Sequence, residues 1–430
     1  MRISTSMVYD QGVGGIQKQQ ADVLKTQQQV STGRRILTPA DDPVASASIL
    51  ELTQSMNVNE QNGTNANVAK NKLQLEESIL TDVGTLIQDV KTLAINAGNG
   101  TLSDSDKASL ATELESRYQA LLGLSNTTDE SGQYLFSGFM GATAPFSEVT
   151  PGNVTYNGDQ GQREIRISAR RQVAVSDSGA DVFQRIKNGN GVFVTAATAG
   201  NTGTGLVSPG NVLDKTKWNL AANNKDFTIK FDVDNSTTPP TTTYDIIDNV
   251  STNSLLTGAA PAAAPYPRTY VSGGAISLSQ VGPPAFDYGA ELKIEGAPAT
   301  GDTFTVKAST NVDLFKTLSN LINVLKNPSA VSKSTVLHNG LSTALSNLDN
   351  ALDNVLTVRA AIGARLKEVE SVQNTREDLT IQYKAAISHL QDVDYAKAIS
   401  DLTLRQMHLQ AAQKSFASTQ SLTLFNYIGG

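Results

Sequence analysis

The apolar residues of the chain follow one period at its two ends and another in its middle. Near the N-terminus they recur at every seventh position, the period of a coiled-coil seam, at Tyr9, Ile16, Val23 and Val30. The same spacing returns near the C-terminus, at Tyr395, Leu402, Leu409 and Phe416. The pattern predicts that each end forms a helix with one apolar stripe.

Between these ends, three further segments alternate apolar steps of four and three, which is typical of amphipathic helices. They cover residues 79–97, 110–124 and 341–390. The sequence NGTLSDSD separates the first two, and Ser103 or Asp104 in it can cap the second helix. The spacing predicts an antiparallel helix pair in the first half and one long helix in the second.

The middle of the chain, about residues 145–310, is rich in Gly, Pro, Thr and Asn, and its apolar residues alternate with period two. Residues 163–168, 227–233 and 302–306 therefore predict half-buried strands. The stretch TTPPTTT, residues 237–243, is interpreted as a loop because proline cannot join a central ladder. The region predicts a β insertion of one or two subdomains.

These patterns predict an α+β multi-domain protein, elongated, in which N- and C-terminal parts form an antiparallel helical bundle around a mainly β insertion. Apolar stripes at both ends are exposed unless they pack together. We expect a terminal coiled-coil domain formed by residues 1–33 with 392–430. Residues 34–145 with 311–391 should form a helical bundle, and residues 146–310 an outer β domain.

A joint between helices is expected at STGRRILTPADDP. Gly33 suits the left-handed position after a last helical turn, and Arg34 and Arg35 complement the negative helix end. Asp42 suits an N-cap, and Pro43 suits the first position of the next helix.

Asp41 and Asp42 as a metal site, or Arg34 and Arg35 as an anion site, are the competing interpretations, and helix-terminus chemistry is favoured over both. Asp392 and Asp394 lie two apart and point to different sides of a helix, which disfavours paired acid–base work. A second joint there is favoured. We hypothesise that Arg34 or Arg35 contacts Asp392 or Asp394.

The composition of the chain argues against several classes of function. The 430 residues carry a net charge of −7 without a basic cluster, which argues against a nucleic-acid partner. No cysteine is present, which removes disulfides and thiol chemistry. No apolar run suits a membrane span, and the N-terminus does not have the pattern of a cleaved signal peptide.

Candidate chemistry is sparse. The histidines, His338, His389 and His408, are too far apart for a pairwise metal motif. Trp218 suits either a glycan-binding face or a core, and core packing is favoured. No nucleophile elbow, phosphate loop or dinucleotide fingerprint is present. The sequence predicts a protein that is not an enzyme and has no cofactor or catalytic residue.

Several motifs in order carry a family resemblance. They are MRISTSM, STGRRILTPADDP, DESGQYLFSGF, NVLTVRAAIGARLKEVE and FASTQSLTLFNYI. Across about the first 150 and last 120 residues, the chain resembles the flagellin-like family of hook-associated protein 3, found at the junction of hook and filament. The insertion at about residues 190–310 is longer than in the simplest members.

The resemblance implies a secreted, extracellular structural subunit of the bacterial flagellum that forms a homo-oligomeric ring. Its implied neighbours are another hook-associated protein on the hook side and flagellin on the filament side. It also implies type III export without a cleaved signal peptide, and an export chaperone on the C-terminal helix.

The resemblance gives the terminal stripes a role as well. Ile16, Val23 and Val30 would face Tyr395, Leu402, Leu409 and Phe416 in a subunit-assembly seam. Short heptad segments are unstable alone, so we expect both ends to be mobile in the monomer. The alternative functions are a minor flagellin that forms filaments and a secreted adhesin that binds through the β domain.

Overall fold

The computed structural model describes residues 5–150, 152–261, 263–326 and 333–428. The expected domain ranges also include residues 1–4, 151, 262, 327–332 and 429–430, which lie outside the described residues. The helices are α1 (Thr5–Thr32), α2 (Pro43–Ala97), α3 (Asp104–Ser125), α4 (Lys215–Trp218), α5 (Leu314–Lys326), α6 (Lys333–Gln391) and α7 (Tyr395–Ile428), with a π-helical turn η1 (Ala180–Gln184).

The strands are confined to the segment between α3 and α5. They are β1 (Phe146–Thr150), β2 (Asn153–Tyr156), β3 (Glu164–Ser168), β4 (Arg171–Ala174), β5 (Ile186–Lys187), β6 (Phe193–Ala197), β7 (Leu206–Val207), β8 (Asn211–Val212), β9 (Asp226–Asp234), β10 (Thr241–Asp248), β11 (Arg268–Thr269), β12 (Ala275–Gln280), β13 (Phe286–Glu295), β14 (Thr303–Ala308) and β15 (Asn311–Val312).

The chain divides into two compact units. The terminal unit contains residues 1–66, 167–169 and 370–430, and the central unit contains residues 67–166 and 170–369. Helices α2 and α6 contribute to both units, because each continues past the boundary.

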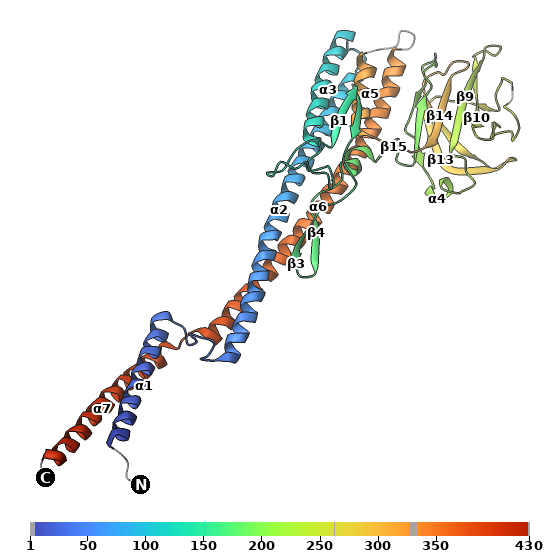
Figure 1. The fold of residues 1–430 in the computed structure, drawn as a ribbon. Coiled ribbons are helices and arrows are strands. Elements are labelled where there is room, and N and C mark those ends of the chain that lie inside the picture. The colour runs from blue at the N-terminus through green and yellow to red at the C-terminus, as the bar shows by residue number, and fades with distance from the viewer. Residues whose placement is uncertain (1–4, 151, 262, 327–332, 429–430) are drawn as a thin grey trace. The chain divides into compact units, whose positions relative to one another are not determined.

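In the terminal unit, α1 and α7 lie side by side (Figure 1). The pair is antiparallel, because the ring of Tyr9 near the start of α1 lies 5.4 Å from that of Phe416, far along α7. An ion pair of 3.6 Å joins Asp22 to Arg405 at mid-length. The two ends of the chain therefore meet in one helical hairpin.

In the central unit, α2 and α6 run antiparallel and are joined by polar side chains, such as Arg359 with Glu77 at 2.7 Å. Helix α3 returns alongside α2, where Arg117 lies 3.3 Å from Asp89. Ser103 caps α3 through a reciprocal capping box with Asp106, which confirms one of the two predicted caps. The buried residues of α2 include Leu73, Leu80, Val83, Ile87 and Val90, and those of α6 include Leu348, Val355, Ile362 and Val369.

The β region contains a sandwich and smaller hairpins. One sheet has the order β11-β10-β9-β14-β6, and another has the order β12-β13-β7, with β8 also paired to β13. The pairs β1-β2, β3-β4 and β15-β5 form two-stranded sheets. The predicted strands at residues 163–168, 227–233 and 302–306 are confirmed as β3, β9 and β14.

One expected loop was partly wrong. Residues Thr241 to Thr243 begin strand β10 and pair with Asp234 to Asp232 of β9. The β-branched threonines favour a strand, and Pro239 and Pro240 precede the first paired residue, where their missing N–H groups cost nothing. The turn is therefore shorter than the stretch suggested.

Aromatic side chains fill the sandwich. Trp218 is 1% exposed, and its ring lies 5.1 Å from Phe193 and 6.3 Å from Phe227. The prediction of core packing for Trp218 is confirmed. The two larger sheets share this core with Ile229, Phe231, Ile276, Leu292 and Phe304.

An asparagine row on α6, Asn339, Asn347, Asn350 and Asn354, holds the segment that leads into the sandwich. Asn339 accepts the N–H of Val207 at 3.0 Å and donates to the carbonyl oxygen of Gly205 at 3.1 Å. Asn350 donates to the carbonyl oxygens of Lys187 and Gly189, both at 2.8 Å. Asn347 accepts the N–H of Gly189, and Asn354 donates to the carbonyl oxygens of Asp181 and Val182 in η1, both at 2.9 Å. The asparagine side chains of the row thus bind backbone groups of this segment rather than its side chains.

Candidate assembly surfaces

The predicted joint is a loop between α1 and α2 that meets the break between α6 and α7. Gly33 has a φ of +69°, the left-handed conformation expected of a residue just past a helix end. Its carbonyl oxygen accepts the N–H of Val393 at 2.9 Å, and the N–H of Arg35 donates to Gln391 at 2.7 Å. Backbone hydrogen bonds therefore join the α1–α2 loop to the connection between α6 and α7, although the two are distant in sequence.

Arg34 and Asp392 face each other as an antiparallel β-bridge, so the contact between them runs through the backbone. The side chain of Arg35 donates to the carbonyl oxygen of Leu390 at 2.8 Å and lies 3.4 Å from the carboxylate of Asp42. Among the described residues, neither arginine forms an ion pair with Asp392 or Asp394.

The carboxylates instead act locally. Asp394 accepts the N–H of Lys397 at 3.1 Å, as an N-cap of α7 does, and Asp392 accepts the hydroxyl of Ser388. Asp42 accepts the N–H of Ala45 at 3.0 Å and caps α2, whose first residue is Pro43.

Asp41 orders the loop. Its carboxylate accepts the N–H groups of Leu37 and Thr38 at 3.0 and 2.9 Å, and it pairs with Lys25 at 2.6 Å. The hydrogen bond from Lys25 and those from the backbone lower the pKa of Asp41 to about 2. Within the part of the chain that the structure describes, no group of three or more His, Cys, Asp or Glu residues is arranged to hold a metal ion.

The seam residues of α1 and α7 lie on the facing sides of the helical hairpin. Six of the seven are half-buried, and Tyr395 is 53% exposed beside Gly33. The half-buried ones are Ile16, Val23, Val30, Leu402, Leu409 and Phe416. Two helices alone therefore cover these side chains only in part.

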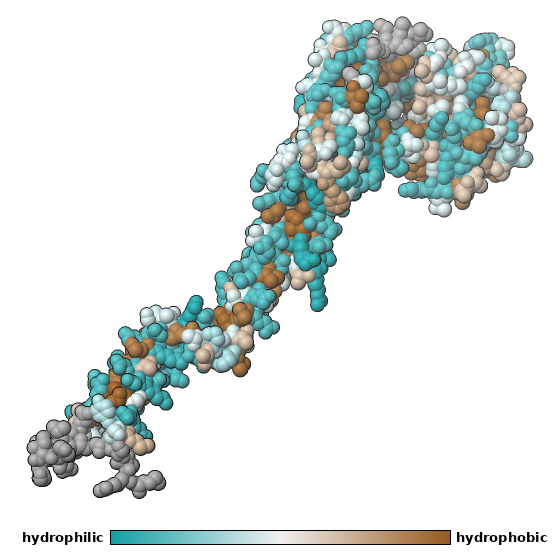
Figure 2. Space-filling model, viewed as in Figure 1, coloured by the Kyte–Doolittle hydropathy of each residue, from teal (hydrophilic) through white to brown (hydrophobic). Residues whose placement is uncertain are grey.

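Helix α7 carries a second apolar face. At about 100° per residue, Leu404 and Met407 point roughly 150° away from the stripe that faces α1. Their side chains are 49% and 55% exposed. Figure 2 shows apolar residues at the surface of the terminal helices. Exposed apolar surface of this kind is typical of an interaction site.

The central unit holds a buried polar network. The guanidinium of Arg365 makes two hydrogen bonds of 2.9 Å to the carboxylate of Asp177. The N–H of Asp177 donates at 3.0 Å to Glu76, which is 1% exposed. Burial, followed by the neighbouring charge of Asp177, raises the pKa of Glu76 to about 8. Burial therefore favours the protonated form of Glu76.

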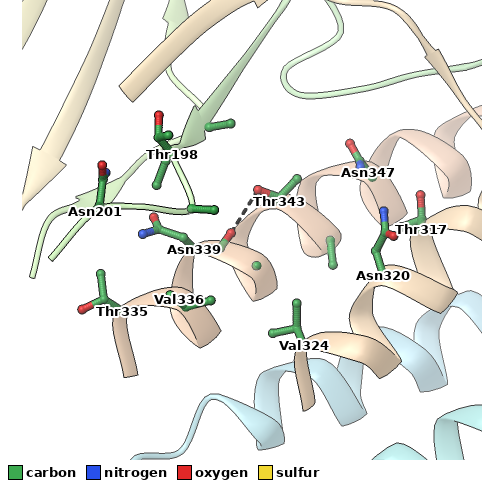
Figure 3. A pocket seen from close by; sticks show the side chains of 15 residues that line it. Thr198, Asn201, Thr317, Asn320, Val324, Thr335, Val336, Asn339, Thr343 and Asn347 are labelled. Atoms are coloured by element: carbon green, nitrogen blue, oxygen red, sulfur yellow. Dashed lines mark hydrogen bonds between the residues drawn. The ribbon is translucent and has the colours of Figure 1, made fainter. Parts of the chain in front are cut away.

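A crevice of about 290 Å³ opens between the end of β6 and helices α5 and α6 (Figure 3). Its polar side chains are amides and hydroxyls, including Asn201, Asn320 and Thr335, and its described lining contains no charged residue. Asn339 and Asn347 of the lining already bind backbone. Among the described lining residues, amide and hydroxyl side chains supply the polar groups of the crevice.

Family models match both helical ends of the chain. The model of the bacterial flagellin N-terminal helical region matches residues 3–140, and that of the C-terminal helical region matches residues 345–428. The two matches together span about half of the chain. The chain belongs to the flagellin-like family.

This flagellin-like chain is similar to named relatives over most of its length. It is 28% identical to flagellar hook-associated protein 3 of Salmonella typhimurium, over 99% of both chains. The crystal structure of the flagellar junction protein FlgL from Legionella pneumophila covers 80% of this chain and all of its own length, with a TM-score of 0.67 and 29% identity. Phase 1 flagellin of Salmonella naestved is 30% identical over 28% of this chain and 24% of its own.

The predicted resemblance to hook-associated protein 3 and the predicted fold class are confirmed. No helix among the described residues is long and apolar enough to cross a membrane.

Sequence reasoning missed the Glu76 network and the asparagine row of the flagellin-like chain. Glu76 follows Leu73 by three and precedes Leu80 by four, so it occupies an apolar position of the α2 stripe. That spacing could have identified a buried acid. The asparagines carried no comparable signal, because polar residues on a helix usually face water.

Proposed function

We propose that the protein is a structural, non-enzymatic subunit of the bacterial flagellum, located at the junction of hook and filament. Similarity to hook-associated protein 3 over 99% of the chain supports this role. The observation that carries the mechanism is the second apolar face of α7, because Leu404 and Met407 lie away from α1 and are half exposed. Subunits assemble by burying such faces against other copies.

The proposed assembly is a homo-oligomeric ring. Another hook-associated protein binds on the hook side, and flagellin binds on the filament side. Residues 1–33 with 392–430 form the assembling domain, residues 34–145 with 311–391 the helical bundle, and residues 146–310 the outer domain. The seam residues of α1 and α7 lie at the centre of the assembling domain, and the joint residues Gly33 to Pro43, with Asp392 and Asp394, connect it to the bundle.

Export precedes assembly in this proposal. The chain leaves the cell through the flagellar type III system without a cleaved signal peptide. An export chaperone covers α7 until then, because a helix that is apolar on two faces aggregates if left uncovered.

Hydrogen–deuterium exchange on the free chain and on the assembled junction tests this mechanism. Backbone amides of α1 and α7 should exchange rapidly in the monomer and slowly in the assembly, since short heptad segments depend on packing for stability. Amides of residues 73–90 in α2 should be protected in both states and serve as an internal control. Strong and equal protection of α1 in both states would contradict the proposal.

A minor flagellin is the second candidate, because the chain is 30% identical to a flagellin over 28% of its length. The two functions differ in what the purified chain builds alone. A flagellin polymerises into long filaments, whereas a junction subunit forms only short assemblies. Electron microscopy of the concentrated protein distinguishes them.

A further inference from the structure

A polar layer interrupts the contact between α2 and α6 in the terminal unit. The side-chain amide of Asn59 donates to the carbonyl oxygen of Arg376 at 2.9 Å and to the hydroxyl of Thr380 at 2.8 Å. These hydrogen bonds fix the two helices at this level. The layer places an arginine where a coiled-coil seam ordinarily carries an apolar residue.

The guanidinium of Arg376 lies against the backbone of α2 at Gly63. A Cβ atom added at Gly63 would lie 2.4 Å from the guanidinium carbon, so a larger residue there would displace the guanidinium. The close approach packs the guanidinium against α2, and Arg376 is half-buried.

Arg376 differs from the two other arginines of α6 that contact α2 or its surroundings. Arg359 pairs with Glu77 at 2.7 Å, and Arg365 pairs with Asp177 at 2.9 Å. Among the described residues, Arg376 has no carboxylate within ion-pair distance. Its Nε atom is buried and without a hydrogen-bond partner. The buried Nε atom is out of reach of another molecule, so a partner group would bind the two terminal nitrogens of the guanidinium.

We propose that Arg376 binds a carboxylate of a second copy of this chain when subunits assemble, an inference that rests on the proposed function. A guanidinium presents parallel N–H donors that match the two oxygens of a carboxylate. The group that binds there is acidic, because the guanidinium of Arg376 is positively charged and has no carboxylate partner. A second copy supplies it, because the chain carries 41 acidic residues against 34 Lys and Arg, leaving carboxylates in excess.

Apolar residues beside the site complete the docking surface. Leu379, three positions after Arg376 and so on the same helix face, is 37% exposed, and Val58, next to Asn59, is 53% exposed. A charged anchor with apolar neighbours is the composition typical of the energetically important part of an interface.

The test compares Arg376→Gln with Lys384→Gln in the full-length chain. Lys384 is an exposed lysine on the same helix and forms no ion pair among the described residues, so its substitution removes the same charge. Self-association is measured by sedimentation velocity over a range of concentrations and salt. Thermal unfolding of the dilute monomer is followed by circular dichroism.

Arg376→Gln should weaken self-association by about tenfold to a hundredfold, the effect of losing hydrogen bonds to a charged group. It should leave monomer unfolding unchanged, and Lys384→Gln should change neither. Wild-type association should also weaken with salt more steeply than that of Arg376→Gln. Reversal to Arg376→Glu, combined with single acid-to-lysine changes in the terminal unit, should restore association for the acid that Arg376 binds.

Three results would overturn the inference. Equal association of wild type and Arg376→Gln would show that Arg376 binds no partner. Destabilisation of the monomer by Arg376→Gln in parallel with lost association would assign Arg376 to the register of α2 and α6 within one chain. A wild-type chain that does not associate under any condition would overturn the proposed function along with the inference.

Discussion

Helix α2 belongs to both units of the molecule, and its two portions are packed very differently. In the central unit, Leu73, Leu80 and Ile87 are completely buried. In the terminal unit, the buried positions of residues 43–66 are Ala45, Gly63 and Ala66, while Val44 and Leu50 are 79% and 71% exposed. One continuous helix therefore changes from a core element to a surface element.

The difference does not come from helix propensity, because both portions are helical throughout. It comes from the number of neighbours. The central portion contacts α3, α6 and residues of the β region such as Asp177, and the terminal portion contacts α6. Two helices cannot enclose a core, so apolar residues of the terminal unit remain available to other molecules.

Truncation of one leucine in each unit gives the largest expected contrast. Leu80→Ala should lower the free energy of unfolding of the central unit by about 2–5 kcal/mol, because a buried leucine leaves a cavity. Leu402→Ala should cost the monomer about 1 kcal/mol or less, because Leu402 is only partly buried, and should weaken assembly instead. Hydrogen exchange measures each unit separately. Equal losses in the monomer would show that α1 and α7 already enclose a core.

Between pH 5 and 9, the central unit should lose stability as pH rises. The pKa of Glu76 is raised in the folded state, so the folded chain binds a proton that the unfolded chain loses. Stability is then fully present below the ordinary glutamate pKa of 4.5 and declines as pH rises toward about 8. Glu76→Gln, which keeps the acceptor for the N–H of Asp177, should remove this decline and raise stability at pH 9 by roughly 1–3 kcal/mol.

Thermal unfolding of both proteins from pH 5 to 9 measures the effect. Asp41, whose pKa is lowered, has the opposite sign: its contribution is present at neutral pH and is lost only as pH falls toward 2. If the stability of wild type and of Glu76→Gln depended on pH in the same way, the pKa of Glu76 would not be raised by folding.

A pair of glycine substitutions gives the smallest contrast. Gly33→Ala should destabilise the joint by about 1–2 kcal/mol, because a side chain at a φ of +69° is strained and the new Cβ would lie 2.9 Å from the hydroxyl of Tyr395. Gly123→Ala in α3 meets no atom within 4 Å and should be neutral or stabilising. Proteolysis at the joint reports the first change. Unaltered cleavage of Gly33→Ala would show that the joint is already loose.

Local chemistry made much of the fold predictable. Gly33, Pro43 and Ser103 follow rules that act over a few residues, and each occupies the predicted position. The strands β9 and β14 followed from alternation for the same reason. The contacts of the candidate site were harder to predict from the sequence. The bridge between Arg34 and Asp392 uses backbone groups, which are the same in every sequence, and the pairing of Arg365 with Asp177 spans 188 positions without a periodic signal.

The asparagine row of α6 has a consequence for how this protein varies. Its side-chain amides bind backbone carbonyl and N–H groups. The attachment of the sandwich to α6 therefore does not depend on which side chains the bound segment carries. Related chains are therefore free to diversify or lengthen the outer sheets while keeping the same anchorage. A foreign β domain grafted between residues 192 and 309 would keep the backbone contacts of Asn347, Asn350 and Asn354 and lose those of Asn339 with Gly205 and Val207.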